Sequence, residues 1–128
     1  MRHQKNRLLK IDTGAKKKAV YLRVLLTNLV QHGKLTTTQK RGKVVKSEID
    51  HFFSKLLEIT ARFADEKDAR RECIRYITSI IYGDEGKKVI DILLPKYVQE
   101  GRKTGFVALY NLGFRTGDAA PKVLLKLL

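Results

Sequence analysis

The feature that most limits the fold is a run of apolar residues between positions 39 and 64 that recurs every three or four positions. The run consists of Val45, Ile49, Phe52, Phe53, Leu56, Leu57 and Phe63. This spacing places all of them on one side of a helix, so we predict a single helix over residues 39–64. Its apolar side needs a second layer of structure to cover it.

Apolar and turn-forming residues predict the other elements. A helix over residues 15–32 begins at an Asp12 or Thr13 cap and ends at Gly33. A third helix covers about 68–82, and a short one covers 89–98, where Pro95 must kink or stop it. Branched and aromatic residues predict strands at 35–38, 104–113 and 121–128, and the last two are joined by FRTGDAA as a hairpin.

Together these elements predict a two-layer α+β fold, in the order helix, strand, three helices, two strands. A small sheet of about three strands packs against the helices. A chain of 128 residues is one domain by ordinary size statistics. We therefore expect a single domain over residues 15–128, preceded by a basic extended N-terminal tail over residues 1–14.

The positive charge is concentrated near the N-terminus. Residues 1–46 contain 13 of the 27 Lys and Arg residues but only one of the 13 acidic residues, Asp12. The remaining 82 residues are nearly balanced, with 14 basic and 12 acidic side chains. A block of one sign points to a polyanionic partner rather than to a generally solvated surface.

Basic N-terminal segments also serve as targeting signals. The Leu pair at 8 and 9 is followed at once by Lys10 and Asp12, so no apolar stretch of secretory length follows the charges. A transit peptide would be rich in Ser and Arg, and this segment has no Ser. No stretch approaches the length of a membrane span. We expect a cytoplasmic protein without a membrane partner.

No catalytic or metal-binding constellation is visible. The single cysteine, Cys73, falls in the apolar series of the third helix, and the three histidines share no metal-ligand spacing. No glycine-rich loop is followed by the Lys-Ser or Lys-Thr pair of a phosphate-binding enzyme. We expect no enzymatic activity, no metal, no cofactor and no small-molecule substrate.

Candidate phosphate-binding residues fall into four groups: the tail, the first helix, the start of the long helix, and the Gly-flanked Arg of the hairpin link. Thr37 and Thr38 are also candidates, although they can equally serve only as strand and cap residues. Cations at the start of a helix oppose its dipole, and an anion relieves this. The candidates are Arg2, His3, Lys5, Arg7, Lys10, Lys16, Lys17, Lys18, Arg23, Thr37, Thr38, Lys40, Arg41, Lys43 and Arg115.

Several stretches together resemble the bacterial large-subunit ribosomal protein seventeen family. They are MRH at the start, NLVQH (28–32) followed by LTTT (35–38), and GFRTGDAAP (113–121) before an apolar last strand. The order and approximate spacing match across the whole chain. Three places depart from the family pattern: Lys17 and Lys18 replace the usual His-Arg, RGKV (41–44) replaces RAKE, and Ala108 stands at the usual Arg.

The resemblance implies a structural constituent of the large ribosomal subunit that acts in the cytoplasmic ribosome. It implies binding to large-subunit ribosomal RNA near the polypeptide exit tunnel and contact with neighbouring ribosomal proteins. Read without the resemblance, the residues indicate only a basic α+β nucleic-acid binder, and an architectural DNA-binding protein is the alternative. Such a protein would use a basic recognition helix or a β-arm that carries an apolar wedge.

Deleting residues 2–11 tests the role of the tail. The deletion removes four cations and should make the salt dependence of binding to a large-subunit RNA fragment shallower by about 3 log-log units, at roughly 0.7 to 0.9 per phosphate. The melting temperature should not change, because the segment is too polar to join a core. An unchanged salt dependence would show that the tail makes no phosphate contacts.

Overall fold

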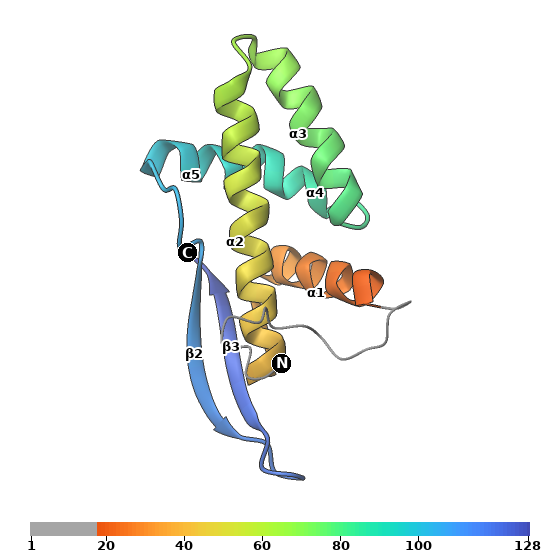
Figure 1. The fold of residues 1–128 in the computed structure, drawn as a ribbon, viewed down its shortest axis with the longest axis vertical. Coiled ribbons are helices and arrows are strands. Elements are labelled where there is room, and N and C mark those ends of the chain that lie inside the picture. The colour runs from red at the N-terminus through yellow and green to blue at the C-terminus, as the bar shows by residue number, and fades with distance from the viewer. Residues whose placement is uncertain (1–17) are drawn as a thin grey trace, which may run out of the picture.

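A 24-residue helix, α2 (Gln39–Arg62), runs along the long axis of the molecule in the computed structural model, which describes residues 18–128 (Figure 1). The helix α1 (Lys18–His32) and the strand β1 (Lys34–Thr38) precede it. Gly33 joins α1 to β1 with φ +74°, a conformation that glycine adopts without strain, and its N–H donates to Leu29 O at 2.8 Å. The first residues of the predicted helix, its Asp12 or Thr13 cap and the predicted boundary between 14 and 15 lie outside the described residues.

The apolar side of α2 forms the centre of the core, as predicted. Val45, Ile49, Phe52, Phe53 and Leu56 are buried, and Leu57 and Phe63 are half-buried against them. The helix ends at Arg62, two residues before the predicted end, because Phe63 takes an extended conformation. Its side chain still packs on the core, which explains why its spacing resembled that of a helical residue.

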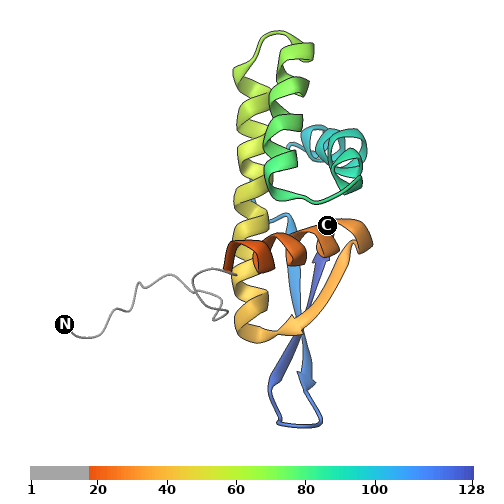
Figure 2. The same ribbon diagram turned by 90° about the vertical axis from the view of Figure 1, so that its right-hand side faces the viewer.

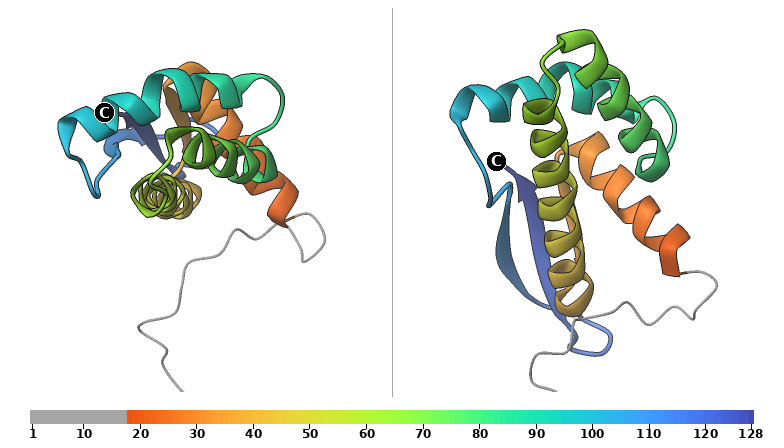
Figure 3. Two further views of the ribbon diagram at one scale, coloured as in Figure 1. Left: turned by 90° about the horizontal axis from the view of Figure 1, so that it is seen from above. Right: turned by 45° about the horizontal axis from the view of Figure 1, so that its top comes forward.

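The sheet contains three antiparallel strands in the order β1-β3-β2, with β2 (Val107–Phe114) and β3 (Pro121–Leu127) joined as a hairpin. Both α1 and α2 contact this sheet, and in the right-hand view of Figure 3 α2 lies across β3 with α1 beside it. The inner side contributes a row in which Leu125 pairs with Leu35 of β1 and Leu109 of β2. The predicted two-layer α+β fold is confirmed.

The helix α3 (Glu66–Ile80) folds back along the upper half of α2 (Figure 2). It begins two residues before the predicted start because Asp65 caps it and accepts a bond from Lys67 N at 3.1 Å. It ends at Ile80, since Ile81 is extended, and Gly83 belongs to the following turn rather than to the helix end. Ala69, Cys73 and Ile77 are buried, as their spacing predicted.

The predicted short helix at 89–98 is the later part of a longer helical segment. It consists of α4 (Glu85–Lys88), the π-helical turn η1 (Val89–Leu93) and α5 (Leu94–Glu100). Pro95 neither stops nor breaks this segment. The wider π turn immediately before Pro95 leaves room for the proline ring, which has no N–H to donate to the preceding turn.

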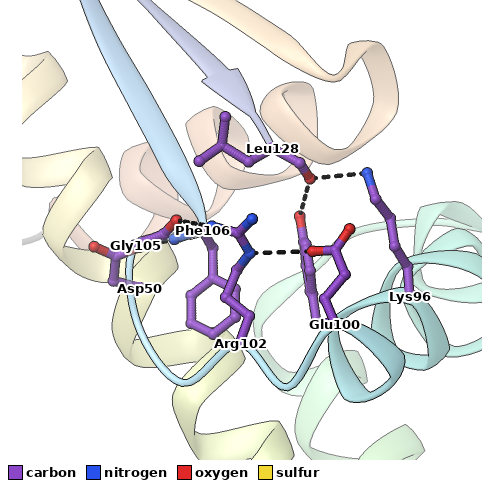
Figure 4. A network of polar contacts seen from close by, with 8 residues as sticks. Asp50, Lys96, Glu100, Arg102, Gly105, Phe106 and Leu128 are labelled. Atoms are coloured by element: carbon purple, nitrogen blue, oxygen red, sulfur yellow. Dashed lines mark hydrogen bonds and ion pairs between the residues drawn. The ribbon is translucent and has the colours of Figure 1, made fainter.

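A polar network joins the end of α5 to the sheet (Figure 4). Asp50 Oδ1 of α2 accepts a bond from Phe106 N at 3.0 Å, and Arg102 donates to Glu100 Oε2 and Gly105 O. The hydroxyl of the buried Tyr97 and the ammonium of Lys96 both donate to Leu128 O, at 3.1 and 3.0 Å. These bonds fix the start of β2 and the end of β3 against the helices.

The first turns of α2 approach the sheet closely at Gly42. A Cβ atom at this buried position would lie 2.4 Å from Val123 Cγ2 and 3.5 Å from Thr37 Cγ2. A separation below 3 Å cannot persist, so either the helix or Val123 would have to move. The contact therefore requires a residue without a Cβ atom at position 42.

A double-mutant cycle tests this contact. Gly42→Ala should destabilise the protein by about 1 to 2 kcal/mol, because overpacking outweighs the gain in helix propensity. Combining it with Val123→Ala should cost less than the sum of the two single changes, with a coupling of roughly 0.5 to 3 kcal/mol by chemical denaturation. Additive losses would show that the two residues do not share the contact.

Candidate nucleic-acid interface

Four elements and the hairpin link meet around an open hollow of about 340 Å³ beside the start of α2. We call it the basic hollow. It is lined by Tyr21, Leu25, Thr36, Thr37, Thr38, Arg41, Arg115 and Lys122. Four of the predicted candidates, Thr37, Thr38, Arg41 and Arg115, are therefore brought together by the fold. The lining includes three cationic side chains and no carboxylate.

The junction between β1 and α2 places the hydroxyls and the helix start in the hollow. Thr38 is the N-cap of α2 with an extended backbone, as predicted, but its side chain makes no capping hydrogen bond. No acidic residue lies in the first turn, where Lys40 and Arg41 are found instead. The positive end of the helix dipole is thus reinforced by cations, an arrangement that an anion would stabilise.

Arg41 is held over the floor of the hollow by an aromatic ring. Its Cζ lies 5.2 Å from the centre of the Tyr21 ring, within the range of a cation–π contact. The contact restricts the long side chain and leaves its exposed guanidinium with donors available to a planar acceptor. The geometry suits a phosphate or carboxylate group.

Arg115 lies in a tightly closed turn. Its guanidinium forms two bonds to the Asp118 carboxylate, Nε to Oδ1 at 2.9 Å and Nη2 to Oδ2. Asp118 also accepts from Ala120 N, and the turn is completed by Ala119, a non-glycine residue with φ 56°. The hydrogen bonds from the Arg115 guanidinium and, second, from Ala120 N lower the pKa of Asp118 to about 2, and the Asp118 carboxylate raises the pKa of Arg115. The bidentate partner of Arg115 in this structure is Asp118, and binding of phosphate by Arg115 stays a prediction.

Arg23 has a different environment from the other candidates. Its Nε donates to Ile80 O at 3.1 Å at the end of α3, and its Cζ lies 4.0 Å from the centre of the Tyr82 ring. The side chain therefore connects α1 to α3, with its Nε bonded to Ile80 O and its Nη2 to Thr78 O at 3.5 Å. A role for Arg23 in RNA binding has no geometric support beyond its charge.

The remaining candidates lie either at the starts of helices or outside the described residues. Lys40 and Lys43 are exposed on the first turns of α2. Lys18 is the first residue of α1. The other predicted residues lie outside the described part of the chain: Arg2, His3, Lys5, Arg7, Lys10, Lys16 and Lys17.

The sequence reasoning missed the lysines of the sheet. Lys122 lines the basic hollow, and Lys34 pairs directly with Lys126 across β1 and β3. The alternation in PKVLLKLL contained the signal, because Lys122 and Lys126 are four residues apart in a strand and share a face.

Other kinds of site find no support in residues 18–128. Within that range no group of three His, Cys, Asp or Glu residues could hold a metal ion. Cys73 is buried, and this burial raises the pKa of its thiol, which disfavours the nucleophilic thiolate. None of the helices described has the length and apolarity needed to cross a membrane.

A comparison with protein families decides the identity. The family model described as Ribosomal protein L17 matches residues 21–128. The chain belongs to the ribosomal protein L17 family. Among its relatives is the large ribosomal subunit protein bL17 of Thermotoga maritima, 34% identical over 99% of this chain and 94% of that protein. The bL17 protein of Thermoanaerobacter sp. strain X514 is 32% identical over 92% of this chain and 96% of its own length.

Membership of the L17 family confirms the resemblance seen in the sequence. The chain is a structural protein of the large ribosomal subunit, part of the translation machinery, and not an enzyme. The bL17 protein of Syntrophotalea carbinolica is 30% identical over 99% of this chain and 74% of its own length. The expected cytoplasmic ribosome is the location that this family indicates.

Replacing Arg115 tests the turn that closes the hollow. In Arg115→Ala the pKa of Asp118 should rise from about 2 toward its ordinary value, because the bonds that favour the carboxylate are lost. Carboxyl chemical shifts followed through an acid titration measure this directly. Since Asp118 binds its proton less readily in the folded chain, the stability that the pair contributes is present above the ordinary pKa and is lost as pH falls toward 2.

The control for this titration is Arg102→Ala, which removes a different exposed ion pair, with Glu100. It should leave the Asp118 titration unchanged. An Asp118 pKa that stays near 2 in Arg115→Ala would show that the backbone of the turn, rather than the guanidinium, stabilises the carboxylate.

Proposed function

We propose that this chain binds large-subunit ribosomal RNA through the end of the molecule that holds the basic hollow. The observation that supports this most strongly is the separation of charge. Residues 18–46 contain seven basic residues and no acid. Residues 66–100, which form α3 and the helical segment after it, contain seven of each sign. A polyanion is attracted to the first region and not to the second.

Phosphate is the group that the hollow recognises. Arg41 and Lys122 offer charge, Thr36 to Thr38 offer hydroxyls, and the start of α2 adds its dipole. These contacts fix the position of an RNA backbone without reading its sequence. The tail, with its four Lys and Arg residues before position 11, extends the same basic region.

The place near the polypeptide exit tunnel and the contact with neighbouring ribosomal proteins are implied by the family resemblance. The balanced end of the molecule suits the protein contacts. There Ile74 and Ile92 are 44% and 59% exposed among ion pairs such as Arg70–Asp91, with an N–O distance of 2.9 Å. Such a mixed surface resembles the average protein interface more than an RNA-binding one.

A pair of charge-matched variants tests the proposed interface. Replacing Arg41 and Lys43 together by Gln should make the salt dependence of binding to a large-subunit RNA fragment shallower by about 1.5 log-log units, at roughly 0.7 to 0.9 per contact. The matched control replaces Lys67 and Arg71 of α3 by Gln and should leave the slope unchanged. Filter binding between about 50 and 200 mM salt covers the range in which such slopes are measured.

Two outcomes would contradict the proposal. Equal loss of slope in both variants would mean that the protein binds RNA through its net charge alone. Equal affinity for duplex DNA of the same length would favour the alternative, an architectural DNA-binding protein. Circular dichroism melting should show that both variants remain folded, since exposed substitutions usually change stability by about 0.5 kcal/mol or less.

A further inference from the structure

Opposite the buried row Leu35–Leu125–Leu109, the other side of the sheet presents a basic surface with an aromatic ring, and its last row borders the basic hollow. The strand pairing arranges its side chains in three rows across β1, β3 and β2. The rows are Lys34–Lys126–Ala108, Thr36–Leu124–Tyr110 and Thr38–Lys122–Gly113. We call this surface the open sheet face. Its nine positions include three lysines and no acid.

Tyr110 is the most prominent side chain of the middle row. It is 50% exposed, and its neighbour Leu124 is half-buried beside it. Lys122 and Lys126 lie two positions to either side of Leu124 along β3. The Cα atom of each lysine is therefore about 7 Å from the Cα atom of Leu124. Tyr110 thus lies beside a β3 side chain that has a cation on either side of it along the strand.

No carboxylate on this face balances the positive charge of its three lysines. Lys34 lies directly opposite Lys126, and like charges at such positions repel and destabilise the strand pair. Position 108 of β2 carries Ala, so the contribution of β2 to this face is the ring of Tyr110 rather than a charge. An occupant that supplies both negative charge and flat apolar groups would relieve the repulsion and cover Tyr110.

We infer that the open sheet face binds a single-stranded segment of RNA, with an unpaired base stacked on Tyr110 and its flanking phosphates on Lys122 and Lys126. Bases in a duplex are already stacked and paired, so an exposed ring on a sheet surface selects unpaired ones. A protein partner would have to be acidic to match three lysines. The inference rests on the proposed RNA-binding function and adds base stacking to the phosphate contacts of the basic hollow.

Substitutions of Tyr110 in the full chain test the stacking. Tyr110→Leu should weaken binding to an oligouridylate of about 12 nucleotides by roughly 5- to 100-fold, whereas Tyr110→Phe should bind like the wild type because the ring remains. The salt slope should stay unchanged in both variants, since no charge is lost. In contrast, Lys126→Gln should make the slope shallower by about 0.7 units, the value for a single-strand phosphate contact.

A fluorescent reporter gives a direct reading. The chain contains no tryptophan, so Tyr110→Trp introduces a single one. Its emission should be quenched when the oligouridylate is added and should change little with an RNA duplex of equal length. Phe114→Leu is the matched control, because it removes a more exposed ring, 69%, whose partner Pro121 lies on the helix side of β3. This control should leave the affinity unchanged.

The outcomes separate the inference from the function it rests on. If wild type and Tyr110→Leu bind the oligouridylate equally while a large-subunit RNA fragment still binds with a steep salt slope, the stacking is wrong and the proposed function stands. Equal weakening by Tyr110→Leu and Phe114→Leu, or equal quenching by duplex RNA, also overturns the stacking at this face. If the wild type binds no RNA fragment, both proposals fail.

Discussion

The close approach of α2 to the sheet at Gly42 is the contact on which the arrangement of the interface depends. Only the absence of a Cβ lets the first turns of α2 rest on Val123 and Thr37, where an added atom would lie 2.4 Å from Val123 Cγ2. The same turns carry Arg41 and Lys43, and the same strand carries Lys122. A larger residue at 42 would displace the helix or Val123 and so change the spacing of these cations. Packing within the core thereby sets the spacing of charges on the surface.

The two ends of the molecule have different surfaces, one with balanced charge and one that is basic. At the α3 end, charges of both signs form pairs such as Arg75–Glu72 and Arg62–Glu58, with N–O distances of 3.0 and 3.1 Å, so little field remains. At the sheet end, cations from α2, β1 and β3 face the hollow and the open sheet face with few carboxylates. Exposed pairs add little stability, so their effect is mainly to confine the attraction of a polyanion to one end.

The sequence allowed the elements to be predicted wherever a periodic apolar side met a turn residue, as in α2 and at Gly33. It did not reveal the π turn before Pro95, because that depends on how the helix accommodates a missing donor. Thr37, Thr38, Arg41 and Arg115 were predicted as candidates, and the fold brings them together. The pairing of Arg115 with Asp118 and of Arg23 with Ile80 was not predicted, since both depend on local turn geometry and on contacts between distant helices. Lys122 and Lys126 were missed because strand alternation was used for the core and not for the opposite face.

Lysine footprinting tests the central claim, that RNA is bound by the sheet end, most directly. The protein is acetylated alone and in complex with a large-subunit RNA fragment, and modification at each lysine is compared by mass spectrometry. We predict protection of Lys34, Lys43 and Lys126, all exposed in the free chain, with no change at the equally exposed Lys67 and Lys87. Uniform protection of all five, or protection confined to Lys67 and Lys87, would contradict the account.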